Sequence, residues 1–211
     1  MRVLRLACAA VAVTACGGGG DGGGTQPPPQ IASVAITSPS GAQTIAACGT
    51  VNFTAQALNA AGGVVSGATI NWTSSDPSKV ALSSATGAST TGSGVGIGSS
   101  TVRATANNGA VTSNGVGVTV TGGGAGANAE VAATASNTFS PSCVTISAGG
   151  SVAWTFVATP SHNVKFTSAR PTGGDIQTTQ STTVSRTFQA AGSYPYHCDL
   201  HPGMTGTVVV Q

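Results

Sequence analysis

Hydrophobic and polar residues alternate along short stretches of this chain, and turn-forming residues separate the stretches. Residues 51–57 are apolar at every second position, and Val152, Trp154 and Phe156 share the same spacing. Successive side chains of a β-strand point to opposite faces, so one face of each stretch is predicted to line a core. Outside the N-terminus we find no convincing amphipathic helix. The pattern therefore predicts an all-β fold.

Residues 31–121 are expected to form one β unit. Alternation at 51–57 and 70–72 is interrupted by turn signals at 59–63, 75–78 and 107–109. Short strands at this spacing are typical of a β-sandwich.

Residues 129–211 are expected to form a second β unit, joined to the first by a flexible glycine-rich linker at 122–128. Seven aromatic residues lie in this part of the chain, enough for the core of a unit of about 80 residues. Its predicted strands are 130–133, 143–147, 151–156, 163–167, 182–188, 194–198 and 206–210.

The N-terminus has the pattern of an export signal. Residues 1–15 combine a short positive start with an apolar run too short to cross a bilayer. Val13-Thr-Ala-Cys16 resembles a bacterial lipobox, and this resemblance implies that Cys16 becomes the lipid-modified N-terminus. The alternative is an ordinary secretory signal with an incidental cysteine. Residues 16–30, rich in glycine and then proline, are predicted to be a tether.

Composition and charge narrow the class of protein further. The chain has 31 glycines, 6% charged residues and a formal net charge of +2. Such polar, uncharged strands and loops suit an extracytoplasmic β protein, and no motif for binding nucleic acid is visible. Removing residues 1–15 leaves five basic and five acidic residues. A neutral mature protein argues against strong electrostatic attraction to any partner.

Cys198, His201 and Met204 lie at a Cys-x-x-His-x-x-Met spacing. These are soft ligands, and copper favours two histidines and a cysteine with a long axial methionine, whereas the methionine argues against zinc. The chain has three histidines, His162, His197 and His201. His197 adjoins Cys198 in a predicted strand and should point to the opposite face, which leaves His162 as the fourth ligand.

Several motifs of the second unit together resemble the blue (type 1) copper proteins of the plastocyanin and amicyanin family, over residues 128–211. The resemblance implies a cupredoxin Greek-key β-sandwich, one type 1 copper ion and transfer of single electrons between partner proteins. It also implies that Asn163 ties its loop to the cysteine loop. The motifs, in order, are Asn137-Thr-Phe-Ser-Pro141, Val144-Thr-Ile-Ser-Ala-Gly-Gly150, Val152-Ala-Trp154, His162-Asn-Val164 and Tyr196-His-Cys-Asp-Leu-His-Pro-Gly-Met204.

The first unit is similar to bacterial Ig-like (Big) domains. The similarity rests on Gly49-Thr-Val-Asn-Phe-Thr-Ala55, Asn71-Trp-Thr-Ser-Ser-Asp-Pro77 and Thr101-Val-Arg-Ala-Thr105. It implies a spacer or adhesion module, and Trp72 is expected in its core. A spacer is the favoured role, on analogy of fold alone.

Cys8 is expected to be removed with the signal. Two cysteines then remain without a role, Cys48 in the first unit and Cys143 in the second. Unpaired thiols are unusual in an oxidising compartment, so a disulfide across the two units is one interpretation. Two separately buried thiols are the other, and the sequence does not choose between them.

The function expected from these features is that of a membrane-tethered electron carrier, not an enzyme. Three histidines are too few for the additional copper centres of copper enzymes, and four protein ligands leave no open position for substrate. A copper-binding or storage lipoprotein, or a surface adhesion module, without a dedicated redox partner is the alternative. Gly17 follows Cys16 where inner-membrane retention commonly uses aspartate, so an outer-membrane anchor is favoured wherever that membrane exists.

Overall fold

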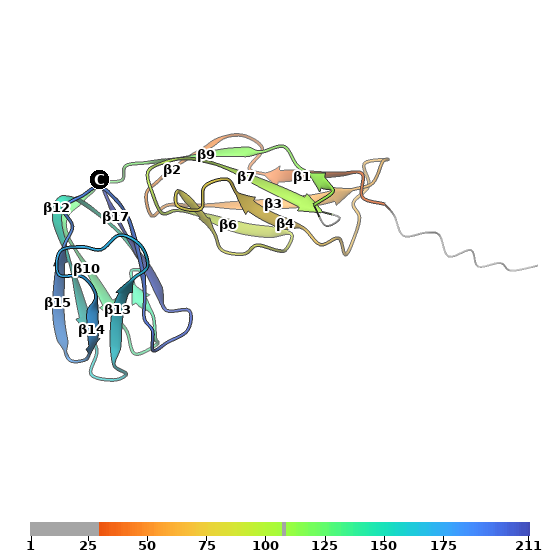
Figure 1. Ribbon diagram of the computed structural model, residues 1–211. Helices are drawn as coiled ribbons and strands as arrows, with labels where there is room; N and C mark the ends of the chain where they lie inside the picture. The colour runs from red at the N-terminus through yellow and green to blue at the C-terminus, as the bar shows by residue number, and fades with distance from the viewer. Residues whose placement is uncertain (1–29, 107–108) are drawn as a thin grey trace, which may run out of the picture.

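Figure 1 shows a computed structural model of the chain, which describes residues 30–106 and 109–211. Every regular element in these ranges is a β-strand, and none of their residues forms a helix able to span a membrane. The all-β prediction is confirmed. The predicted signal peptide (1–15), Cys16 and all of the predicted tether except Gln30 lie outside the described residues.

The N-terminal unit consists of two sheets, with strand orders β1-β3-β6-β5 and β2-β9-β7-β4, and β8 pairs with β7. Buried residues of both sheets form one hydrophobic cluster, so the sheets pack as a sandwich. The strands are β1 (Ser33–Ser38), β2 (Gln43–Ala46), β3 (Thr50–Leu58), β4 (Asn71–Ser74), β5 (Val80–Leu82), β6 (Ser89–Gly94), β7 (Gly98–Ala106), β8 (Val111–Thr112) and β9 (Val116–Thr121).

Alternation in β3 produces the predicted core face. Phe53, Ala55 and Ala57 are buried, while the polar residues between them are exposed. Trp72 is buried against Phe53, with ring centroids 6.1 Å apart, and its indole N–H donates to the Gly87 carbonyl at 2.8 Å. Trp72 is therefore a core residue, as predicted, with its one polar atom satisfied.

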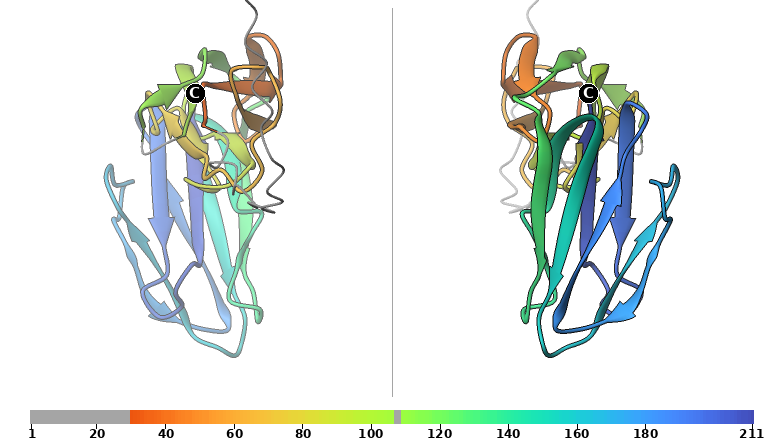
Figure 2. Two further views of the ribbon diagram at one scale, coloured as in Figure 1. Left: turned by 90° about the vertical axis from the view of Figure 1, so that its right-hand side faces the viewer. Right: turned by 90° about the vertical axis from the view of Figure 1, so that its left-hand side faces the viewer.

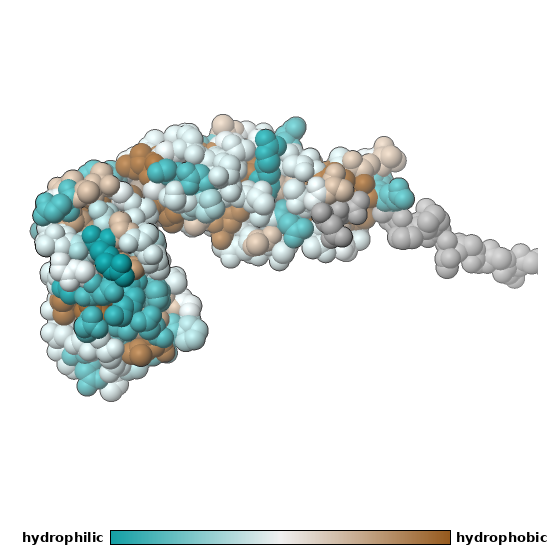
Figure 3. All heavy atoms as spheres, in the orientation of Figure 1, coloured by the Kyte–Doolittle hydropathy of each residue, from teal (hydrophilic) through white to brown (hydrophobic). Residues whose placement is uncertain are grey.

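The C-terminal unit is an eight-stranded sheet with the order β11-β10-β12-β17-β16-β13-β14, and β15 pairs with β12. Figure 2 shows these strands from two sides, and Figure 3 shows hydrophilic residues gathered on the face formed by β13 and β14. The strands are β10 (Gly126–Ala133), β11 (Phe139–Ser140), β12 (Cys143–Phe156), β13 (His162–Phe166), β14 (Ile176–Thr179), β15 (Thr182–Thr187), β16 (Gly192–His197) and β17 (Thr205–Val210).

Strand β12 is one long strand where two, at 143–147 and 151–156, were predicted. Its first part pairs with β17 and its second part with β15, while β10 pairs with residues of both parts. Gly149 has a φ of +85°, and a Cβ at Gly150 would collide with the Ala127 carbonyl. Glycines thus allow β12 to bend and continue from one part of the sheet to the other.

The core of this unit is built around Trp154, which is fully buried. The Tyr196 ring packs edge-on against it at 5.4 Å between centroids, and Phe166 does so at 6.1 Å. Val152 and Phe156 are buried on the same face of β12, as the alternation predicts. Because Phe166 ends β13 and Tyr196 belongs to β16, the Trp154 core holds these two strands in place.

The two units meet at a disulfide between Cys48 and Cys143, which lie 95 residues apart in the chain and 5.6 Å apart between Cα atoms. Val209 of β17 packs in the hydrophobic cluster of the N-terminal unit. β10 begins at Gly126, so the last three residues of the predicted linker belong to a strand. Both a covalent and an apolar contact therefore restrain the joint, which lies near the C-terminus in Figure 1.

Removing this disulfide is expected to lower the free energy of unfolding. Disulfides typically stabilise by about 2–4 kcal/mol, and because the closed loop is long, the Cys48→Ala/Cys143→Ala double variant should lose an amount at or just above the upper end of this range. Denaturant titration under oxidising conditions would measure the difference. Adding a reductant should bring the wild-type transition to that of the variant and leave the variant unchanged. Wild-type transitions that coincide before and after reduction would contradict the expectation.

Candidate metal centre

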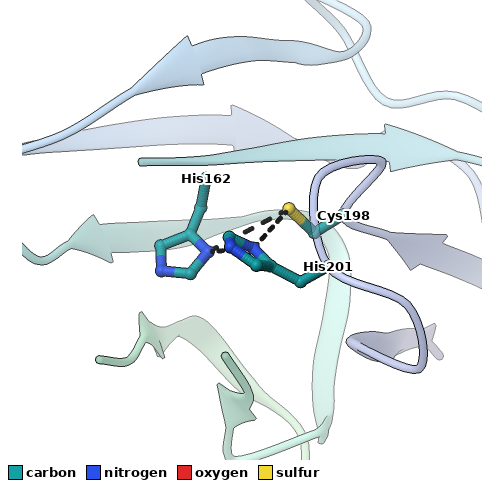
Figure 4. Close-up of side chains that lie close together, drawn as sticks. All are labelled: His162, Cys198 and His201. Carbon is teal, nitrogen blue, oxygen red and sulfur yellow. Dashed lines mark hydrogen bonds between the residues drawn. The ribbon is translucent and has the colours of Figure 1, made fainter. Parts of the chain in front are cut away.

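Three donor atoms from two segments of the C-terminal unit converge. His162 begins β13, Cys198 directly follows β16, and His201 lies in the loop before β17. The two Nδ1 atoms are 3.1 Å apart, and Cys198 Sγ lies 3.5 Å from Nδ1 of His201 and 4.0 Å from Nδ1 of His162 (Figure 4). All three donors lie within 4.8 Å of one another.

The chemistry of these donors fits a soft metal cation. His162 is 0% exposed, and burial, followed by the charge of a protonated His201, lowers the pKa of its imidazole, partly offset by the Thr134 backbone. The neutral imidazole, which has a free lone pair on one ring nitrogen, is the form that coordinates metals. A ring N–H or the thiol can donate across these distances in the metal-free protein, and once those protons are lost the same three atoms can bind one cation.

The loop between β16 and β17 is closed by its own backbone. The Cys198 N–H donates to the Met204 carbonyl at 3.0 Å, and the Met204 N–H donates to the His201 carbonyl at 3.1 Å. Gly203 has a φ of +83°, which glycine adopts without strain. Met204 is buried in the hydrophobic core of the unit. The structure thus places Met204 on the same tight loop as Cys198 and His201.

Asn163 connects the two segments that carry the histidines and the cysteine. Its Oδ1 accepts from the Asp199 N–H at 2.9 Å, and its Nδ2 donates to Asp199 Oδ2 at 3.4 Å. Asn163 is itself buried, whereas the Asp199 side chain is 50% exposed, so the two contacts are part-buried. The side chain therefore fixes the distance between β13 and the cysteine loop, as the family resemblance implied for this position.

Asp199 was not among the predicted site residues, and its place directly after Cys198 was the only available signal. Its Oδ1 also lies 2.9 Å from His197 Nε2. The His197 side chain is 40% exposed, whereas Cys198 is buried, in agreement with the prediction that the two point to opposite faces. The remaining predicted site cysteines, Cys48 and Cys143, lie at the joint between the units.

Known proteins match this part of the chain. The family model of copper binding proteins, plastocyanin/azurin family, matches residues 127–211. Amicyanin-alpha of Methylorubrum extorquens is 39% identical over 71 residues, which cover 32% of this chain and 60% of that protein. The plastocyanin of Scenedesmus fuscus is 37% identical over 84 residues, which cover 35% of this chain and 86% of the relative.

Among solved structures, amicyanin from Paracoccus versutus is 32% identical, with a TM-score of 0.34, over 40% of this chain and 81% of that one. The chain spans about 60% of the length of two of the curated relatives, 60% for amicyanin-alpha and 58% for the chloroplastic plastocyanin of Tetradesmus obliquus. The coverage of the Scenedesmus plastocyanin is higher, and copper is the metal of the matched family. Through its C-terminal unit, the chain belongs to the plastocyanin/azurin family of copper binding proteins.

Proposed function

We propose that this protein carries single electrons on one copper ion held by His162, Cys198, His201 and Met204. The convergence of two imidazole nitrogens and one thiol within 4.8 Å supports this proposal most directly. Copper bound by such a set exchanges one electron between Cu(I) and Cu(II), at a potential tuned by the axial ligand and by the surroundings of the sulfur.

The surroundings of these four residues favour electron transfer over catalysis. The Trp154 core and the Asn163 contacts hold β13 and the cysteine loop in one arrangement. Rigid donors change position little between two charge states of the ion, which favours rapid exchange. With four protein donors, no coordination position is open for a substrate, so we propose a carrier and not an enzyme.

Electrons are proposed to leave beside His201. Leu200, its neighbour, is 47% exposed and apolar, whereas His162 is fully buried. A small apolar surface suits the brief, low-area encounters of redox proteins. The alternative function, copper binding or storage without a redox partner, would use the same site. Slow electron exchange or an irreversible potential would distinguish it from an electron carrier.

The N-terminal part of the chain is proposed to tether this carrier outside the cytoplasm of a bacterium. Val13-Thr-Ala-Cys16 supports a lipid at Cys16, and the β-sandwich of the N-terminal unit supports an Ig-like spacer between the anchor and the metal site. An outer-membrane anchor is favoured by Gly17, which takes the position after the cysteine.

The Cu(II) form is expected to show an intense visible charge-transfer band from the Cys198 sulfur, and reduction should abolish it. Cys198→Ala should lose the band because the sulfur is its source. Absorption spectroscopy of the copper-loaded full chain would measure this, with Cys48→Ala/Cys143→Ala as the control that keeps the band. A colourless Cu(II) complex, or a band that persists in Cys198→Ala, would refute the copper assignment.

Asn163→Ala is expected to weaken copper binding about 10–100-fold, because the amide no longer holds the cysteine loop against β13. Competition with a chelator of known affinity would measure the dissociation constants. Gln177→Ala is a suitable control, since Gln177 is an exposed polar residue of the adjoining strand β14. Equal affinities for the wild type and Asn163→Ala would mean that the loop holds its position without this contact.

Cys16→Ser is expected to abolish lipid modification and to release the protein from membranes. Detergent partitioning and mass spectrometry of the mature N-terminus would measure the result for the wild type and the variant. Identical processing and membrane attachment in the two proteins would show that another feature anchors the chain.

A further inference from the structure

The C-terminal unit gathers its positive charges in one place. Residues 129–211 contain three basic and three acidic residues, so this part of the chain has no formal net charge. In the structure, all three basic side chains contact a single acidic residue, Asp175. We call Asp175 and these three neighbours the Asp175 surface; the neighbours are Lys165, Arg170 and Arg186.

Each cation reaches Asp175 in a different way. Arg170 Nε lies 3.3 Å and Lys165 Nζ 3.9 Å from its carboxylate oxygens. Arg186, by contrast, donates to backbone carbonyls, from Nη2 to Asp175 at 2.8 Å and from Nε to Gly174 at 2.8 Å. Arg186 has no carboxylate partner within the part of the chain that the structure describes.

The Asp175 surface therefore carries a local excess of positive charge. Partial burial raises the pKa of Asp175, but the Phe166 N–H, Arg170 and Lys165 outweigh it, so the net shift is downward and the carboxylate stays ionised. Three positive charges around one negative charge leave a local charge of +2. Arg170 is 57% exposed, so this excess is accessible to a partner.

One edge of this surface approaches the metal centre. Lys165 of β13 is paired directly with His197 of β16, and His197 precedes Cys198. Paired strands are about 5 Å apart, so the backbone of Lys165 lies within a few residues of the cysteine. Asp175 and its partner Arg170 lie at the Phe166 end of β13, away from His162. Figure 3 shows the hydrophilic residues of this face over β13 and β14. At its margin, Asp199 is engaged by His197 and Asn163.

We propose that the Asp175 surface docks an acidic redox partner protein, with Lys165 at the edge nearest the metal centre. This inference rests on the proposed electron-carrier function. Complementary charge raises the rate of encounter and orients the partners, while contributing less to affinity, as a short-lived redox complex requires. Recognition of anionic lipid usually involves clusters of four to eight basic residues, more than the three found here. A protein partner is therefore favoured over a membrane surface.

The first test compares redox probes of opposite charge. Oxidation of the Cu(I)-loaded full chain by ferricyanide, an anion, should slow about tenfold as salt rises from about 10 mM to about 500 mM. Oxidation by tris(phenanthroline)cobalt(III), a cation, should not slow. Arg170→Glu and Lys165→Gln should each remove most of the ferricyanide effect with an unchanged copper spectrum. Arg103→Gln, which removes one charge from β7 of the other unit, should behave as the wild type.

The same proteins should discriminate between partner proteins. At low salt, an acidic c-type cytochrome should exchange electrons about tenfold faster than a basic one of similar potential, and Arg170→Glu should abolish the preference. Equal rates for both cytochromes, or salt-independent rates with ferricyanide, would overturn the docking proposal. If the spectrum and a reversible potential are present in that case, the electron-carrier function stands.

A third measurement does not depend on copper. Hexacyanochromate(III), an inert paramagnetic anion, should broaden the NMR signals of Lys165, Arg170 and Arg186 in the metal-free protein before those of Arg103.

Binding to anionic membranes is tested by chemical acetylation of the two lysines, Lys79 and Lys165. The ratio of labelling at these two lysines is measured with phosphatidylglycerol vesicles and with phosphatidylcholine vesicles. An unchanged ratio of labelling supports a protein partner. Selective protection of Lys165 by phosphatidylglycerol, or broadening that avoids the Asp175 surface, would overturn the proposal.

Discussion

The close approach of one thiol and two imidazole nitrogens is the constraint on which the C-terminal unit depends. A metal site requires its donors to stay within a narrow range of distances, so the surrounding structure must fix the segments that carry them. The Trp154 core supplies part of that rigidity by packing against both strands that lead to the site. A Cβ at Gly206 would overlap the Tyr196 ring, so β17 also lies directly against this core. Asn163 completes the arrangement by joining the segments where their strands end.

The candidate site could be predicted from sequence because most of it is local. Cys198 and His201 lie on one loop, so their spacing alone predicts that they meet, and the backbone of Met204 closes the same loop. His162 could be identified as the fourth ligand by elimination, because His197 had to face away from Cys198. The core faces of β3 and β12 were predictable for a similar reason, because alternation depends on the period of a single strand and not on the partner it pairs with.

Features that depend on distant segments could not be predicted. Pairing of Cys48 with Cys143 requires the two units to meet at those positions, which neither local sequence encodes. Two strands were predicted in place of β12 because Gly149 and Gly150 resemble a turn. Pairing with several strands keeps β12 continuous in the structure. The distribution of charge on the surface also depends on distant segments. The count of charges predicted no preferred face, yet Lys165, Arg170 and Arg186 come from three segments that meet at Asp175.

The disulfide at the joint has a consequence for the order in which the protein matures. The described ranges contain three cysteines, which allow three different single pairings, and Cys143 is nearer in sequence to Cys198 than to Cys48. Shorter loops close at a lower entropic cost, so an unfolded chain exposed to oxidant would favour the wrong pair. Cys198 is buried in the folded unit, whereas Cys48 and Cys143 are half-buried. Folding of the metal-binding unit, or occupation of its thiol, before oxidation therefore favours the correct pairing.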